Sequence, residues 1–304
     1  FVDPVSQQTL AFRPDITAQV GRIATTRLAG VARPLRISYG GPVLKLKATQ
    51  LRPERELIQA GAELVGSDSV AAVIEVIGIA IEALRSAGVK SITLDLTLPD
   101  LVDLLAAGPL PVRPDSLEPI KAALDAKDAG SLASAGGQAF MPLISAAGPI
   151  ETAVAALRGL GLGDVLETRL EALEEIAAFF AGDVRVTLDP TERHGFEYQS
   201  WIGFSLFAEG LAGEAGRGGS YAILHADGRE EPAVGFSLFL DSLVDAALMQ
   251  ASARRLFLPL GTPPDVSAEQ RKRGWVTVAA ICPACDPVAL GCSHKLEAGE
   301  PVAL

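Results

Sequence analysis

The alternation of apolar and polar residues near the start of the chain predicts a β-hairpin over residues 37–66, ISYGGPVLKLKATQLRPERELIQAGAELVG. Lys45 and Lys47 alternate with apolar residues in its first strand, and the second strand covers Glu56–Val65. Pro53 lies between them and has no backbone donor for a β-ladder, so it marks the break between the strands. Such a hairpin on an antiparallel sheet often holds a small ligand, although a half-buried hairpin with solvated lysines fits the same pattern.

Apolar residues that repeat every three to four positions predict helices over residues 16–28 and 70–87. Asp15 or Thr17 stands where the first helix would be capped, and Asp68 precedes the second helix. Side-chain oxygens at such positions accept hydrogen bonds from the first backbone N–H groups of a helix. We therefore expect these residues to mark helix starts.

The middle of the chain has a different composition. Residues 98–182 are rich in Ala and Leu and are punctuated by Gly and Pro, which predicts several short helices inserted between two blocks of strands. Further strands are predicted at 184–188 and 196–208. A glycine-rich loop is then predicted at 210–219, followed by a strand that begins at residue 220.

Blocks of strands separated by helices predict an α+β fold, with an antiparallel sheet flanked by helices. We expect a core over residues 1–254, which includes the helical insertion, and a small C-terminal α/β segment over residues 255–304. Within that segment, the apolar run 276–282 is predicted to form a buried strand.

Charge narrows the range of partners. The chain has 37 acidic and 26 basic residues, a formal net charge of −11, whereas nucleic-acid-binding proteins usually present a basic surface to phosphates. We therefore expect no nucleic-acid partner. The most apolar long segment, residues 70–84, is interrupted by Glu75 and Glu82, so we expect no membrane span.

Three cysteines among 304 residues provide no disulfide framework and fit a reducing compartment, so we expect a cytoplasmic protein. No glycine-rich phosphate-binding loop with its lysine is present, and we expect no cofactor. The chain begins at Phe1 rather than at methionine and shows no signal peptide, so we expect a further segment before it in the natural protein.

Five blocks of sequence carry a resemblance to a known family. They are residues 10–22 (LAFRPDITAQVGR), 37–66, 188–208 (LDPTERHGFEYQSWIGFSLFA), 218–221 (GGSY) and 233–245 (AVGFSLFLDSLVD). In this order and spacing they resemble the catalytic core of the histidyl-tRNA synthetases. They are more similar to the synthetase-like regulatory subunits of ATP phosphoribosyltransferase. The resemblance implies a class II aminoacyl-tRNA synthetase-like fold.

Departures from the synthetase pattern separate these two relatives. The arginine that clamps the α-phosphate in synthetases corresponds to Lys45 here, and an acidic residue corresponds to Lys47. A lysine lacks the bidentate fork of an arginine. Ser242 stands where the third class motif has its arginine, and His194 where the histidine-specific block has another. The resemblance therefore implies a protein that has lost amino-acid adenylation and has no catalytic residues.

The part of the synthetase site that would hold an amino acid is better preserved. Free histidine needs polar partners for its ammonium group, its carboxylate and both ring nitrogens. By resemblance, an aspartate and a threonine meet the ammonium group, a glutamine and a glutamate line the pocket, two tyrosines form its wall, and a glycine allows close backbone approach. The implied histidine-binding residues are Asp15, Thr17, Gln59, Glu63, Tyr198, Gly219 and Tyr221.

Four of these residues also have an ordinary structural explanation. Asp15 fits a helix cap, Gln59 and Glu63 fit solvated strand positions, and Tyr198 fits core packing. In the regulatory subunits, histidine also has an alternative place, at the contact with the catalytic subunit.

A cysteine-rich stretch near the C-terminus suggests two interpretations. Cys282, Cys285, Cys292 and His294 form a zinc-like set of donors with one short spacing. Cys282 also follows an apolar run and fits a buried small apolar residue. The synthetase-like families give no reason for a metal here, so we expect none.

The resemblance implies a non-catalytic regulatory subunit of ATP phosphoribosyltransferase. Such a subunit forms a homodimer through the class II interface, activates a short catalytic subunit and carries feedback inhibition by free histidine. The alternatives are a divergent histidyl-tRNA synthetase, a stand-alone amino-acid-activating paralogue, or an amino-acid-binding module with another partner.

Overall fold

The chain folds into two compact units, Phe1–Leu248 and Met249–Leu304, and each unit is considered by itself. The computed structural model describes residues 2–45, 55–193, 198–246 and 254–304. No helix within these ranges is long and apolar enough to cross a membrane.

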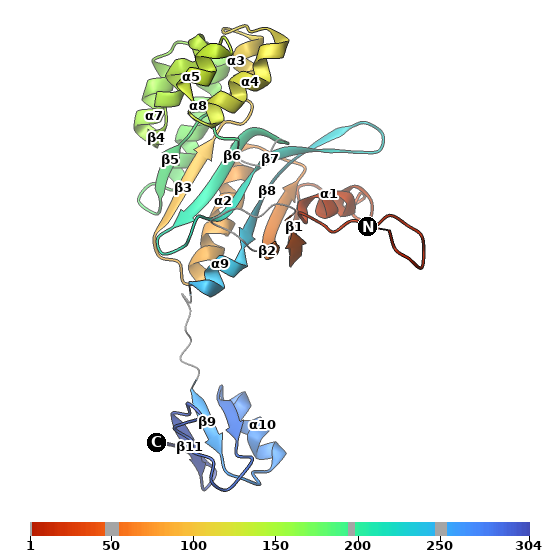
Figure 1. Cartoon of the computed structure of the whole chain (residues 1–304), viewed down its shortest axis with the longest axis vertical. Helices are drawn as coiled ribbons and strands as arrows, with labels where there is room; N and C mark the ends of the chain where they lie inside the picture. Colours follow the sequence, from red (N-terminus) through yellow and green to blue (C-terminus); the bar gives the residue numbers. More distant parts are fainter. Residues whose placement is uncertain (1, 46–54, 194–197, 247–253) are drawn as a thin grey trace. The chain divides into compact units, whose positions relative to one another are not determined.

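The first unit is built on an eight-stranded sheet with the order β1-β2-β8-β7-β6-β3-β5-β4 (Figure 1). Neighbouring strands are antiparallel except for β3 and β5, which are parallel. The predicted α+β class is therefore confirmed. The strands are β1 (Leu35–Leu44), β2 (Glu56–Val65), β3 (Ile92–Thr97), β4 (Gly148–Pro149), β5 (Arg185–Leu188), β6 (Gln199–Ala208), β7 (Glu214–Leu224) and β8 (Glu230–Phe239).

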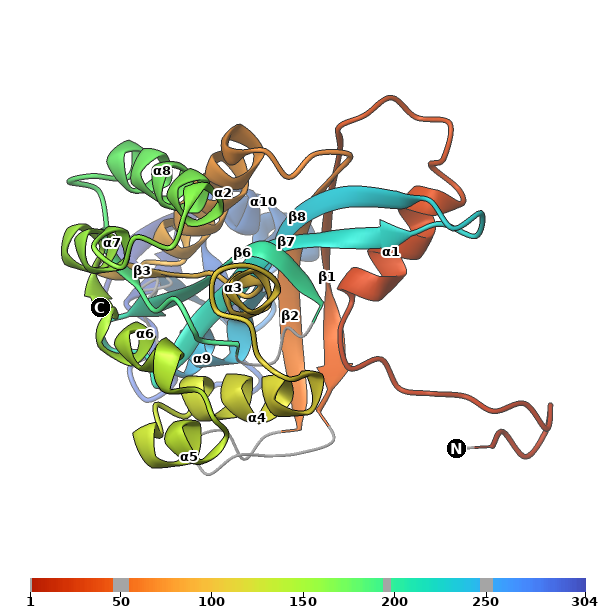
Figure 2. The same ribbon diagram turned by 90° about the horizontal axis from the view of Figure 1, so that it is seen from above.

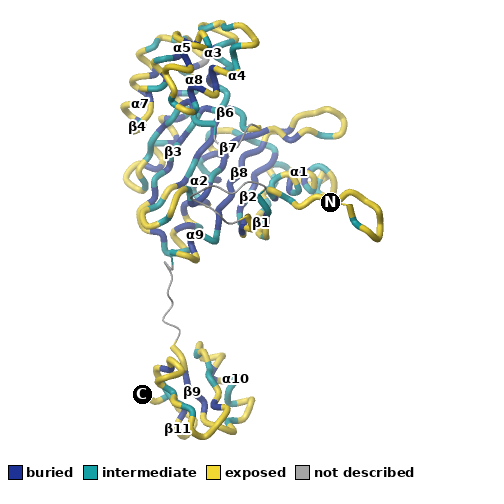
Figure 3. The backbone as a smooth tube through the Cα atoms, viewed as in Figure 1, coloured by how far each residue is buried: buried dark blue, intermediate teal, exposed yellow. Residues whose placement is uncertain are grey.

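Helix α2 (Val70–Ser86) packs against the sheet through a buried apolar stripe that includes Val73, Ile77 and Ile81. Figure 3 shows the burial concentrated in the sheet and in the helices that cover it. The cap of α2 differs from the prediction. Ser69, not Asp68, accepts the hydrogen bond of a first-turn N–H group, at 3.4 Å from the Ala72 nitrogen. A serine one position closer to the helix reaches that group directly.

Helix α1 (Thr17–Thr25) lies at the β1 edge of the sheet (Figure 2). The helices of the insertion gather at the end of the sheet where β3, β5 and β6 meet them (Figure 1). A short helix, α9 (Leu240–Asp245), follows β8. The insertion consists of α3 (Leu101–Ala107), α4 (Pro114–Asp125), α5 (Ala129–Ser134), η1 (Gln138–Phe140), α6 (Met141–Ser145), α7 (Ile150–Arg158) and α8 (Asp164–Phe179).

The glycine-rich segment 210–219 was predicted to be a loop, and this prediction is wrong beyond its first residues. β7 begins at Glu214 and includes Gly216, Gly218 and Gly219. The glycines are needed inside the strand because neighbouring side chains cross it. A Cβ on Gly219 would lie 2.6 Å from Gln199 Nε2. Glycine in a strand often marks such a close approach.

Over its described residues, 254–304, the second unit has a four-stranded sheet with the order β10-β9-β11-β12 and one helix. The strand predicted at 276–282 is shorter than expected and ends at Ala279, and its residues are exposed or half-buried. The apolar sequence predicted a buried strand, but the strand lies at the edge of a small sheet, where its side chains stay partly exposed. The elements are β9 (Arg255–Leu258), α10 (Pro264–Lys272), β10 (Val276–Ala279), β11 (His294–Glu297) and β12 (Glu300–Ala303).

Candidate functional site

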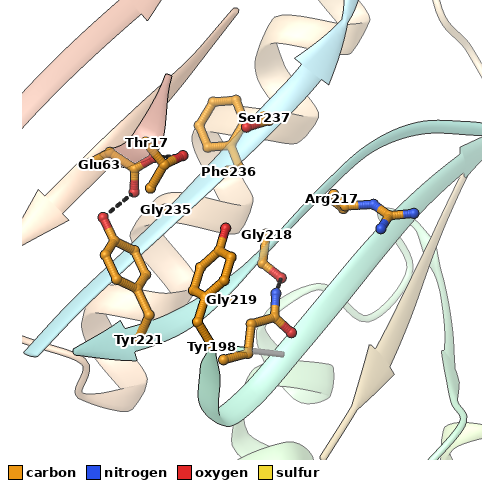
Figure 4. Close-up of a pocket in the computed structure, with 11 residues that line it drawn as sticks. Thr17, Glu63, Tyr198, Arg217, Gly218, Gly219, Tyr221, Gly235, Phe236 and Ser237 are labelled. Carbon is orange, nitrogen blue, oxygen red and sulfur yellow. Dashed lines mark hydrogen bonds between the residues drawn. The ribbon is translucent and has the colours of Figure 1, made fainter. Parts of the chain in front are cut away.

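A buried carboxylate marks the candidate site on β2. Glu63 is 2% exposed, and three hydroxyl groups donate to it. Thr17 Oγ1 and Tyr39 OH each lie 3.1 Å from Oε1, and Tyr221 OH lies 2.8 Å from Oε2 (Figure 4). The site thus joins α1, β1, β2 and β7, which are far apart in the sequence.

Burial dominates the electrostatics of this cluster. It raises the pKa of Glu63 to about 7, although the hydrogen bonds from Tyr221, Thr17 and Tyr39 act in the opposite direction. Burial, followed by the nearby Glu63 charge, also raises the pKa of Tyr221 well above its usual value. Burial also raises the pKa of Tyr39, so Tyr39 and Tyr221 both remain hydroxyl donors at neutral pH.

A row of glycines makes room for this carboxylate. Strand register places Glu63 beside Gly235, Gly235 beside Gly219, and Gly219 beside Gly203. A Cβ on Gly235 would overlap Glu63 Oε2. The row therefore forms a furrow across three strands, and Glu63 extends into one end of it.

Tyr39 belongs to the same cluster although its sequence context did not single it out. It pairs with Gly61 in the β1–β2 ladder, and a Cβ on Gly61 would lie 2.5 Å from Tyr39 OH. The tyrosine can therefore cross β2 and reach β8, where its hydroxyl lies 2.9 Å from Ser237 Oγ. The pairing of Tyr39 with Gly61 could have indicated this contact, but it can be recognised only when the register of β1 and β2 is known.

Gln199 occupies the other end of the furrow. Its amide Nε2 donates to the Gly218 carbonyl at 2.8 Å, and its side chain covers Gly203 and Gly219. The sequence comparison did not single out this residue either. The amide lies directly over the furrow between the two glycines.

The pocket bounded by these residues is small and partly open to solvent. It encloses a cavity of about 10 Å³, which is room for about one water molecule. In Figure 4, Tyr198 and Tyr221 lie on the same side of the furrow, whereas the Arg217 guanidinium points away from Glu63. The lining residues are Thr17, Glu63, Tyr198, Gln199, Arg217, Gly218, Gly219, Tyr221, Gly235, Phe236 and Ser237.

Five of the seven residues assigned to histidine by resemblance line this pocket: Thr17, Glu63, Tyr198, Gly219 and Tyr221. The solvated-strand explanation is wrong for Glu63, which is buried, and core packing is wrong for Tyr198, which is 51% exposed. Tyr198 meets Tyr221 edge to face, with 5.9 Å between ring centroids.

The other two predicted residues lie beside the pocket and bind each other. Gln59 is fully buried, so solvation does not explain it. Its Nε2 donates to Asp15 Oδ2 at 3.0 Å and to Ser237 Oγ at 2.6 Å, and its Oε1 accepts from the Ile16 N–H at 3.1 Å. Asp15 Oδ1 also accepts from the Thr17 N–H at 2.7 Å. The N-cap of α1 is Ile16, which makes no side-chain cap bond, and Thr17 is the first helical residue, so the predicted cap by Asp15 or Thr17 is wrong. Gln59 and Asp15 hold the start of α1 against β2.

The residues that would meet a nucleotide lie near the other end of β2. Lys45 Nζ is 5.9 Å from the centroid of the Phe239 ring, and Ser242 Oγ donates to the Phe239 carbonyl at 3.0 Å. Lys47 and His194 lie outside the described residues. Lys45 and Ser242 therefore both interact with Phe239 of the same chain.

The zinc-like residues do not gather into a site. Across the described ranges, no group of three or more His, Cys, Asp or Glu side chains is placed to hold a metal ion. Cys282 is exposed, so the prediction that it is a buried small apolar residue is wrong. Cys292, in contrast, is buried. His294 instead packs on Trp275, with ring centroids 4.7 Å apart.

The similar curated proteins named here carry the same protein name. An ATP phosphoribosyltransferase regulatory subunit from Paramagnetospirillum magneticum is 43% identical, with 97% of this chain and 79% of the relative covered. A protein of the same name from Rhodospirillum rubrum is 39% identical, with 100% and 81% covered. The family model for histidyl-tRNA synthetase matches residues 1–243.

Solved structures agree with this assignment. An ATP phosphoribosyltransferase regulatory subunit/histidyl-tRNA synthetase from Bacillus halodurans superposes with a TM-score of 0.78 at 25% identity, covering 96% of this chain and 80% of the other. A histidyl-tRNA synthetase from Nostoc shares the fold, with a TM-score of 0.74 at 13% identity and with 95% and 74% covered. The predicted class II synthetase-like fold is confirmed, and the chain belongs to the histidyl-tRNA synthetase-like family of ATP phosphoribosyltransferase regulatory subunits.

Proposed function

We propose that this chain is a non-catalytic regulatory subunit that binds free histidine in the Glu63 pocket and transmits feedback inhibition to a short catalytic subunit of ATP phosphoribosyltransferase. The relatives named above carry the regulatory-subunit name. An ATP phosphoribosyltransferase complex from Thermotoga maritima shares the fold, with a TM-score of 0.62 at 18% identity, covering 79% of this chain and 84% of the other. We place this role in the cytoplasm, in keeping with the low cysteine content.

The buried Glu63 carboxylate carries the proposal. An imidazole ring offers an N–H donor, and a buried carboxylate held by three hydroxyl groups is a strong acceptor for it. The imidazole of histidine titrates in the same pH range as Glu63, so one proton can be shared between them. Tyr221 and Tyr198 supply aromatic faces on the same side.

Binding requires the pocket to widen, because a cavity volume of about 10 Å³ does not admit an amino acid. Gln199 and Tyr198 are the side chains whose movement widens it. The Gln199 amide is held by its bond to the Gly218 carbonyl, and Tyr198 is half-exposed. Rotation of both exposes the furrow over Gly219 and Gly235. Asp15 and Gln59 position the start of α1, and the ammonium group of the ligand would lie beside Asp15.

Regulation follows from linkage. Histidine inhibits the complex only if it binds one state of the assembly better than another, commonly by about 1–3 kcal/mol. The narrow pocket is one such state and the widened, ligand-bound pocket is the other. A homodimer formed through the class II interface would present two of these pockets to the catalytic subunits. The alternative is a histidine site at the contact between the subunits.

Calorimetric titration with histidine tests the pocket. We expect Glu63→Gln to weaken histidine binding at least tenfold, because the charged acceptor is lost. Glu56→Gln is the matched control, since Glu56 lies on the same strand but is exposed, and it should bind as the wild type does. Unchanged binding by Glu63→Gln in the complex with the catalytic subunit would place the histidine site elsewhere.

The rival function is adenylation by a divergent histidyl-tRNA synthetase. It is considered because the family model that matches the chain is that of histidyl-tRNA synthetase. Lys45 and Ser242 replace two arginines that such chemistry uses in the synthetases, and we propose that the activity is lost. Histidine-dependent exchange between ATP and pyrophosphate measures it directly. Clear exchange by the purified chain would overturn the non-catalytic role. A failure to bind or stimulate a short catalytic subunit would overturn the regulatory role.

A further inference from the structure

The loop after β10 brings two sulfur atoms together on the second unit. Cys282 Sγ and Cys285 Sγ lie 2.8 Å apart in the sequence Cys282-Pro283-Ala284-Cys285. Cys282 is exposed and Cys285 is half-buried. A free pair at this separation is unlike an isolated surface thiol, because each sulfur is the nearest reaction partner of the other.

The backbone holds the two cysteines in this arrangement. The Cys285 N–H donates to the Cys282 carbonyl at 3.4 Å, which closes a four-residue turn. Pro283 occupies the second position of that turn, where its fixed φ is favourable. Because a disulfide has a sulfur–sulfur bond of about 2.05 Å, the two atoms need to approach by less than about 1 Å. The turn itself need not be rebuilt.

We propose that Cys282 and Cys285 form a reversible disulfide by exchange with a soluble disulfide compound. The Cys285 thiolate attacks one sulfur of the compound RSSR, forms a mixed disulfide and releases RS⁻. Cys282 then loses its proton and attacks Cys285 Sγ, which releases the second RS⁻. The two thiol protons end on two RSH molecules, so the protein pair is oxidised and the compound is reduced.

The order of attack follows from the contact between the sulfurs. Either sulfur can donate in this contact. With Cys285 as the acceptor, the contact, together with a backbone hydrogen bond at Ile281, lowers the pKa of Cys285. The same contact raises the pKa of Cys282. The thiolate is the attacking species in thiol–disulfide exchange. Cys285 is therefore the first nucleophile and Cys282 the resolving thiol.

The third cysteine is set apart from this pair by burial. Cys292 is 7% exposed and packs with Phe257 and Ala280. A soluble disulfide does not reach it in the folded unit, so it serves as an internal reference. Exposed disulfides have higher reduction potentials than buried structural ones, which makes the pair a dithiol in a reducing compartment and a disulfide under oxidative conditions.

Thiol counting on the full chain tests the proposal. The fully reduced chain is incubated with glutathione disulfide, then unfolded and alkylated, and its intact mass is measured. We expect the alkylated thiols to fall from three to one, with peptide mapping that assigns the remaining thiol to Cys292. Dithiothreitol should restore all three.

Two variants separate the internal bond from other oxidation. Cys292→Ser should fall from two alkylated thiols to none, whereas Cys285→Ser should form no internal disulfide and carry glutathione on Cys282 instead. Three alkylated thiols after treatment, a disulfide that includes Cys292, or a zinc ion bound by the pair in the purified chain would each overturn the proposal.

Discussion

The two ends of β2 carry polar residues that serve different purposes. Near its start, the Ile58 N–H donates to Asp241 Oδ2 at 2.8 Å, and Ser242 donates to the Phe239 carbonyl. These bonds satisfy backbone groups and fix α9 to the sheet. Near its end, Glu63 is held by hydroxyl groups of three other elements.

This difference shows which half of the site remains open to a ligand. At the start of β2, the side-chain bonds satisfy the Ile58 N–H and the Phe239 carbonyl, backbone groups that the fold has to keep paired. Hydroxyl groups can rotate and accept a new partner, so the Glu63 end can exchange an internal bond for one to a ligand. The four predictions below test this contrast.

The largest effect is expected from filling the furrow. Gly235→Ala places a methyl group on Glu63 Oε2, and overpacking of this kind commonly costs about 1–3 kcal/mol. We expect thermal unfolding at a lower temperature and loss of histidine binding in calorimetry. Gly78→Ala is the control, because a Cβ on Gly78 in α2 meets nothing within 4 Å. Equal behaviour of the two variants would show that the furrow is not tightly packed.

The second effect concerns pH. The pKa of Glu63 is raised from 4.5 to about 7 in the folded chain. Between these values the unfolded chain loses the proton that the folded chain keeps, so the free energy of unfolding decreases as pH rises and levels off above about 7. The total decrease is about 3 kcal/mol at about 1.4 kcal/mol per pH unit.

Denaturant unfolding at several pH values measures this dependence. Other carboxyl groups titrate as well, so the informative quantity is the difference between the wild type and Glu63→Gln. That difference should change steadily from pH 4.5 to pH 7 and then remain constant. A constant difference over the whole range would mean that Glu63 is not desolvated.

The third effect is a single hydrogen bond. Tyr221→Phe removes the 2.8 Å bond to Glu63 Oε2 and leaves the ring in place, and loss of a bond to a charged group costs about 1.5–3 kcal/mol at most. Because that bond lowers the pKa of Glu63 in the folded chain, the upper limit of the pH-dependent window should be higher in the variant, while its lower limit stays at the pKa of the unfolded chain. Tyr198→Phe is the control, since its ring also lines the pocket. If the pH dependence of the variant is the same as that of the wild type, the Tyr221 hydroxyl does not influence the ionisation of Glu63.

The sequence predicted the sheet, α1, α2 and five lining residues, because apolar periodicity and the family blocks are local. It missed Tyr39 and Gln199, since both reach the site by crossing glycines on neighbouring strands. It also assigned the glycine-rich strand β7 to a loop. All three errors have one cause, which is that a glycine's role in a strand depends on the side chain that crosses it, and this follows from register rather than from local sequence.

The smallest effect is expected at the other end of β2. A double variant, Lys45→Arg with Ser242→Arg, restores two of the three arginines that the synthetase pattern has and this chain lacks. We expect no histidine-dependent exchange between ATP and pyrophosphate, because Phe239 is buried against Ile16 and Leu57 and fills the space beside Lys45. Histidine binding should be unchanged, because both positions lie at the other end of β2 from Glu63. Exchange activity in this variant would mean that the two ends of β2 still form one adenylation site, and that only the charged groups were lost.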